Sequence, residues 1–193
     1  MTRDEIINII RSSINPPSVC KIAFCDQQYE EFFFPLSVSD ELFIGIVDKD
    51  FILDGFTVRR ISDMTAAERI RGTYLRIHQA EGNVNRISLP PVSLKNWKQV
   101  FQSILASSEN VIIEGYIPDT ARKYFLVGRV TAVGEQGIRF RSFDGSGQWS
   151  ERVMTLKFDD ISAVTFGSSY VTTYSKYVKP YPEINVQNPT RNR

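Results

Sequence analysis

Histidine is nearly absent from this 193-residue sequence, and its scarcity limits the chemistry that the chain could perform. The only histidine, His78 in "LRIHQAEG", ends a helical pattern, and we expect it on the surface beside a helix C-terminus. No Gly-x-Ser-x-Gly motif occurs, and "DGSG" lacks the lysine of a phosphate-binding loop. The sequence therefore predicts a non-enzymatic protein with no catalytic residue, no cofactor and no identified small-molecule substrate. An enzyme is the least favoured alternative, and a cleft with perturbed carboxylates would revive it.

Cysteine is also scarce, with only Cys20 and Cys25 in "CKIAFC". A zinc site usually needs four ligands, with its cysteines in closely spaced pairs, so no metal site is predicted. In a strand, residues separated by an odd number of positions face opposite sides, which argues against a mutual disulfide. We predict two reduced, partly buried thiols, which fits a cytoplasmic location.

Long apolar runs and an excess of one charge are missing too. No run approaches the ~20 apolar residues of a membrane span. The start, "MTRDEIINIIRSSINPP", carries Asp4 and Glu5 before a short apolar stretch and does not resemble a signal peptide. The net charge is +1, whereas a dedicated nucleic-acid binder usually has a clear basic excess. These absences predict a soluble protein without a membrane partner, and they restrict RNA binding to a local basic patch.

What the sequence does contain is an internal similarity. "ISDMTAAERIRGTYLRI" (61–77) shares five residue types in order with "ISAVTFGSSYVTTYSKY" (161–177). Thr2 and Glu5 fit a capping box, and Ser93 can cap a second helix over "LKNWKQVFQSILASS". Thr65 and Glu68 fit a further capping box. The copies are offset by about 91 positions at the helices and about 100 at the shared stretch, which an insertion of about nine residues in "DGSGQWSER" would explain.

Each copy also contains short runs rich in β-branched and aromatic residues, separated by turn-forming residues, which indicates strands. We therefore predict a mainly β fold with flanking helices (α+β), made of two tandem small bent β-barrels, each preceded by an amphipathic helix. The alternative is that the matches are chance. The expected divisions are a first unit (1–82), a linker (83–92), a second unit (93–179) and a flexible tail (180–193).

Two motifs carry a family resemblance. The stretch "VGRVTAVGEQGIRFRSFD" followed by "MTLKFDDISAV" resembles the Sm-like and SH3-like small barrels, through Gly128, Gly134, Gly137, Asp159, Asp160 and Ile161. The chain also resembles an uncharacterised group of bacterial proteins with two tandem Sm-like units, through "FILDGFTVRRISDM", "LPPVSLKNW" and "FDGSGQW". The resemblance implies the tandem barrel fold, and RNA is a ligand of many Sm-like proteins.

Arginines give the strongest remaining signal. Nucleic acid could be bound through arginines beside aromatic residues on the predicted strands: Arg59, Arg60, Arg129, Arg139 and Arg141. The simpler alternative is a solvated strand face neutralised by ion pairs to residues such as Glu135 and Asp144.

A protein partner is the other candidate. Trp149, in the 144–151 hairpin, could anchor a partner or fold back over its own barrel. We expect an interaction protein that presents strand edges and this hairpin to a protein partner or to itself. RNA binding is the alternative.

Overall fold

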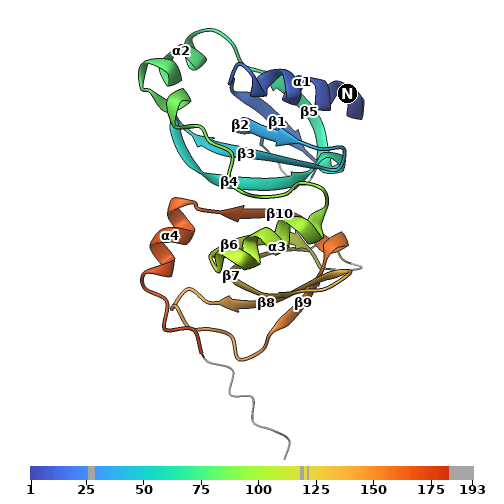
Figure 1. Cartoon of the computed structure of the whole chain (residues 1–193), viewed down its shortest axis with the longest axis vertical. Coiled ribbons are helices and arrows are strands. Elements are labelled where there is room, and N and C mark those ends of the chain that lie inside the picture. Colours follow the sequence, from blue (N-terminus) through green and yellow to red (C-terminus); the bar gives the residue numbers. More distant parts are fainter. Residues whose placement is uncertain (26–28, 118–119, 121, 183–193) are drawn as a thin grey trace, which may run out of the picture.

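The computed structural model describes residues 1–25, 29–117, 120 and 122–182 (Figure 1). Within this part of the chain, the helices are α1 (Arg3–Ile14), α2 (Thr73–Ala80), α3 (Trp97–Ser107) and α4 (Ser169–Ser175). The first strands are β1 (Cys20–Phe24), β2 (Glu31–Val38), β3 (Leu42–Lys49), β4 (Ile52–Arg60) and β5 (Met64–Arg69). The others are β6 (Asn110–Tyr116), β7 (Lys123–Val133), β8 (Gly137–Phe143), β9 (Met154–Lys157) and β10 (Ile161–Phe166). Short 3-10 helices are η1 (Ile61–Asp63), η2 (Asn83–Arg86) and η3 (Phe158–Asp160).

All ten strands join in one antiparallel sheet, in the order β5-β1-β2-β3-β4-β10-β6-β7-β8-β9. The two halves of this order follow the same pattern, because in each half the strand that comes last in the sequence pairs with the one that comes first, β5 with β1 and β10 with β6. Strands β4 and β10 join the halves and lie side by side across the middle of the molecule (Figure 1). The mainly β class with flanking helices is confirmed. Two closed barrels are not, because the sheet is open and ends at β5 and β9.

The two long helices begin at side-chain caps. In α1, the Thr2 hydroxyl accepts the Glu5 N–H and the Glu5 carboxylate accepts the Thr2 N–H, so the predicted capping box is confirmed. The second helix, α3, is capped by Asn96, which accepts the Gln99 N–H at 3.0 Å, and not by Ser93 as we expected. The other predicted box, Thr65 with Glu68, is wrong because both residues lie in β5.

Asn96 also corrects the register of the internal similarity. When Thr2 is matched to Asn96, the buried Ile6, Ile7 and Ile10 of α1 fall on Val100, Phe101 and Ile104 of α3. At the other end of the halves, η1 and η3 correspond, so Ile61 aligns with Phe158 and Met64 with Ile161. The two isoleucines that we matched, Ile61 and Ile161, are therefore not equivalent, and the inserted segment expected in "DGSGQWSER" is much shorter than predicted.

The buried apolar side chains form three clusters. The first lies under α1 and includes Ile6, Ile10 and Phe33. The largest spans both halves, since it contains Ile44 and Val58 as well as side chains of α3, β6 and β10. The third, around Phe143, lies under α4. Because one cluster is shared, the two halves stabilise each other by apolar burial. The unit boundaries remain predictions, and the expected linker includes η2.

Candidate functional site: a strand-pairing joint and an arginine face

The joint between the halves is a four-residue antiparallel ladder. Val58 of β4 lies opposite Val164 of β10, and both are fully buried. Beside them, the hydroxyls of Thr57 and Thr165 are 2.8 Å apart. Cross-strand pairs of this kind, Val with Val and Thr with Thr, are among those that stabilise sheets. The joint is therefore a built interface between two sheet edges.

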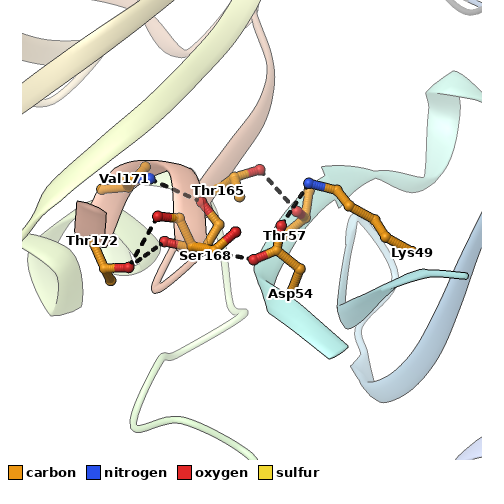
Figure 2. A network of polar contacts seen from close by, with 8 residues as sticks. Lys49, Asp54, Thr57, Thr165, Ser168, Val171 and Thr172 are labelled. Carbon is orange, nitrogen blue, oxygen red and sulfur yellow. Dashed lines mark hydrogen bonds and ion pairs between the residues drawn. The ribbon is translucent and has the colours of Figure 1, made fainter. Parts of the chain in front are cut away.

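Polar contacts close the end of this joint (Figure 2). The Asp54 carboxylate accepts the Ser169 N–H at 2.6 Å and the Lys49 ammonium at 2.6 Å, so it ties the β3–β4 hairpin to the start of α4. Burial alone would raise the pKa of Asp54, but the hydrogen bonds from Lys49 and Ser169 lower the pKa below its ordinary value. The Ser168 hydroxyl accepts the Val171 N–H and caps α4.

The sheet ends at β9 and at β5, and each of these strands has one side that no other strand covers. The Phe158 N–H donates to the Gln136 carbonyl of the neighbouring chain segment at 2.9 Å. Backbone groups alternate in direction along an antiparallel strand, so those of Leu156 also face β8. The N–H of Thr155, between them, therefore points away from β8 to the open edge of the sheet. At the other end, Met1 lies along β5. Its amine is 3.5 Å from the Thr65 carbonyl, and its sulfur is 3.5 Å from the Ala67 nitrogen.

The first two candidate arginines serve the joint. Arg59 is only 2% exposed, pairs with Glu31 at 3.6 Å and lies 3.8 Å above the Phe24 ring. Arg60 donates to the Phe158 carbonyl, so it links β4 to η3 of the other half. Both side chains are engaged within the protein, and this placement does not support their predicted role in nucleic-acid binding.

The other three candidate arginines lie together. Arg129 of β7 is directly opposite Arg141 of β8, and Arg139 is two positions along β8 on the same face. Both guanidinium groups of the opposed pair lie over the ring of Tyr181, 5.2 Å (Arg129) and 5.5 Å (Arg141) from its centre. We call this the arginine face: Arg129, Arg139, Arg141 and Tyr181.

The expected carboxylate partners lie elsewhere. Glu135 pairs with Lys98 at 2.6 Å, and the Asp144 carboxylate accepts N–H groups of its own loop, those of Ser146 and Gln148. In the described part of the chain, no carboxylate lies within ion-pair distance, 4.0 Å, of the three arginines of the arginine face. The simpler reading, in which ion pairs neutralise this face, therefore does not hold for Glu135 and Asp144.

Trp149 belongs to the edge of the same surface. Its indole N–H donates to the Lys179 carbonyl at 2.8 Å, and its ring meets Phe143 and Tyr181 edge-on, at 5.2 and 4.9 Å. The indole is half-buried against its own chain. The indole thus packs against its own chain, and the predicted role of Trp149 as an anchor for a partner stays a prediction. Residues 179–182, which we placed at the end of the second unit and in the flexible tail, pack here, and 183–193 lie outside the described residues.

One buried polar network was not predicted. His78 is fully buried rather than exposed, and its Nε2 lies 2.9 Å from Oδ2 of Asp48. The same oxygen accepts the Tyr74 hydroxyl at 2.7 Å, and Asn83 Nδ2 lies 3.0 Å from His78 Nδ1. The network fastens α2 and η2 to the tip of the β3–β4 hairpin. Only the Asp48, Asp50, Asp54 cluster in "DKDFILDG" signalled a special loop here, and it gave no indication of a histidine partner.

A cavity of about 720 Å³ lies next to this network. Its walls are mainly apolar, from Ile46, Phe51, Leu53 and Phe56, with Glu81 and Arg86 among the lining residues. Among the described residues, no three His, Cys, Asp or Glu side chains are grouped so as to hold a metal ion. None of the described helices has both the length and the apolar character to cross a bilayer.

Comparisons with protein-family models, with curated proteins and with solved structures find no match to this chain.

Proposed function

We propose that the chain is a non-enzymatic binding protein that associates with copies of itself by strand addition, with β9 of one copy paired to β5 of the next. In this proposal each half of the sheet is one small Sm-like unit. The observation that supports it is the β4–β10 joint, in which the corresponding two strands already pair within one chain.

The correspondence follows from the order of elements in each half. β4 leads through η1 into β5, just as β9 leads through η3 into β10. Val58 of β4 then corresponds to Thr155 of β9, and Val164 of β10 corresponds to Ala67 of β5. Val58 and Val164 are opposite each other in the joint, so Thr155 and Ala67 of two copies can meet in the same way.

The backbone chemistry of the two edges fits this pairing. An unpaired strand edge presents N–H and C=O groups that form a template for another strand. Thr155 directs such groups outward from β9. On β5 the matching groups are those contacted by Met1, whose amine lies at the 3.5 Å limit of hydrogen bonding from the Thr65 carbonyl and whose thioether sulfur is a weak acceptor of the Ala67 N–H. Assembly must displace Met1, and one contact at the distance limit and one to a weak acceptor make that displacement inexpensive.

The interface would be heterologous, because it joins two different edges. Successive copies then form a ring if the rotation between them closes, and a filament if it does not. Acid–base chemistry has no comparable support, since the best-placed acid–base pair, His78 with Asp48, is buried and saturated with internal hydrogen bonds.

Sedimentation velocity over a range of protein concentrations tests the proposal. The wild-type chain should exceed its monomer mass of 22.1 kDa as concentration rises. Thr155→Pro removes an outward N–H that is not used within the sheet, so it should keep the fold and abolish association. Thr155→Ala, which retains the N–H, is the matched control and should associate like the wild type. A wild-type chain that stays monomeric throughout, or a proline variant that associates normally while folded, contradicts the proposal.

A further inference from the structure

We propose that the arginine face binds single-stranded RNA, and that Tyr181 occupies the position of a stacked base when no RNA is bound. This inference is independent of self-association, because it concerns a sheet face and not a strand edge. It rests on three features of the described residues, namely an unneutralised arginine pair, an unpartnered buried nitrogen and an aromatic ring already held against two guanidinium groups.

The first feature is electrostatic. Side chains directly opposite in an antiparallel pair have Cβ atoms roughly 4.5–5.5 Å apart, and like charges there are destabilising. Arg129 and Arg141 occupy such a pair, with Arg139 adding a third positive charge on the same face. No carboxylate of the described residues lies within ion-pair distance of these arginines, and a bound phosphate would relieve the repulsion.

The second feature is incomplete hydrogen bonding. Arg141 Nε donates to the Ser150 carbonyl at 2.8 Å, whereas Arg129 Nε is buried and has no hydrogen-bond partner among the described residues. Buried polar groups in folded proteins are nearly always paired, so Arg129 Nε indicates a missing partner with oxygen acceptors, which a phosphate supplies.

The third feature is the ring itself. Tyr181 lies under two guanidinium groups, with Trp149 edge-on at 4.9 Å, so this slot accepts a flat aromatic ring. Proteins that bind single strands combine basic side chains for the backbone with stacking surfaces for the bases. A phosphate beside a planar ring is the repeating unit of RNA, which is why we favour it over an acidic peptide.

Tyr181 is held by its neighbourhood and can be released from it. Lys179 bonds to the hairpin at both of its backbone groups, through the Trp149 indole N–H at 2.8 Å and the Gly147 carbonyl at 3.1 Å. Residues 180–182 can leave without breaking the sheet, because no strand includes them. A base would then replace Tyr181 in the slot.

The test is fluorescence anisotropy of a labelled short oligouridylate with the full chain. If three arginines contact phosphates, affinity should fall about 20-fold between about 50 mM and about 200 mM salt. In Arg129→Gln/Arg141→Gln only one such contact remains, and the fall should shrink to about 3-fold. Arg11→Gln/Arg71→Gln, which also removes two positive charges but from exposed positions away from the arginine face, is the matched control and should leave the salt dependence unchanged. If Arg129→Gln/Arg141→Gln does not fold, Arg139→Gln, at an exposed position, should still reduce the dependence.

Tyr181→Ala separates competition from simple charge attraction. Loss of two cation–π contacts that hold the ring should raise RNA affinity about tenfold. In a Trp97→Phe background Trp149 is the only tryptophan, and its fluorescence should change when the oligomer binds. Inorganic polyphosphate has no bases, so it should displace the oligomer more easily from the wild type than from Tyr181→Ala. The proposal is overturned if Arg129→Gln/Arg141→Gln binds as the wild type does, if Tyr181→Ala weakens binding, or if polyphosphate displaces the oligomer equally well from both proteins.

Discussion

Replacing Asp48 by asparagine should destabilise the protein far more than its small change in shape suggests. Oδ2 of Asp48 receives the Tyr74 hydroxyl and His78 Nε2, while Oδ1 accepts the Phe51 N–H at 3.0 Å. Asn83 Nδ2 donates to the Phe51 carbonyl, which identifies it as the amide nitrogen. Because an amide nitrogen only donates, it must also donate to His78 Nδ1, which therefore carries no proton. The proton of the imidazole is therefore assigned to Nε2, directed at Asp48.

Asparagine cannot satisfy this arrangement. If its oxygen stays on the Phe51 N–H, its amino group faces the Tyr74 hydroxyl and the proton on His78 Nε2. Moving that proton to Nδ1 only transfers the conflict to Asn83. Two hydrogen bonds to a charged acceptor are lost, and at least one buried donor has no acceptor, each at about 1–3 kcal/mol. We expect a loss of about 3 kcal/mol, or about 6–12 °C in Tm for a chain of this size.

Urea unfolding followed by circular dichroism measures the effect. Asp50→Asn is the matched control, because Asp50 is exposed in the same turn at a φ of 50°, a conformation that asparagine tolerates. It should change the free energy of unfolding by less than about 0.5 kcal/mol. If Asp48→Asn and Asp50→Asn unfold at the same urea concentration, the network does not hold the hairpin to α2 and this reasoning fails.

Two further predictions concern ionisation. Burial and the hydrogen bond to Asp48 raise the pKa of Tyr74, and burial raises the pKa of Tyr124 from 10.0 to about 12. Above pH 10 the unfolded chain therefore loses phenolic protons that the folded chain keeps, so the urea midpoint should fall from pH 10 upward, and Tyr124→Phe should make the fall shallower. A midpoint that does not change above pH 10 would contradict this. Burial also raises the pKa of the Cys20 thiol to about 11, whereas Cys25 is exposed and neither is in a disulfide. A thiol-reactive dye should label only Cys25 in the folded protein and both residues in urea, and rapid labelling of Cys20 without denaturant would show that β1 opens.

The sequence identified most of the strands and both long helices, because their apolar periods are strong, yet it misplaced the second helix. A helical stripe repeats after three or four residues, so Trp97, Val100 and Phe101 fit the pattern of α1 almost as well as the correct set one turn later. β5 was missed because "MTAAER" is rich in alanine and charge, which is typical of a helix. Its strand conformation comes from pairing with β1, a contact distant in sequence.

The candidate sites divide in the same way. Period two placed Arg139 and Arg141 on one face, but the pairing of Arg129 with Arg141 and the approach of Tyr181 depend on register and on the return of the chain after α4. The position of His78 could not be predicted, because a histidine at a helix end is normally solvated. Here it is the Asp48 carboxylate on a neighbouring hairpin that makes burial favourable.

The two proposed surfaces are compatible because they use different parts of the same strands. Strand addition at β9 uses backbone groups in the plane of the sheet, whereas RNA would contact side chains that stand perpendicular to it. Arg139 lies opposite Thr155, so the arginine face adjoins the edge at which the next copy would join. Association would place the arginine faces of successive copies next to one another. A long RNA bound at one face would then meet the next face at high effective concentration. A chain with a net charge of +1 would then hold RNA through repetition of a small site, without the basic excess that a single binding domain requires.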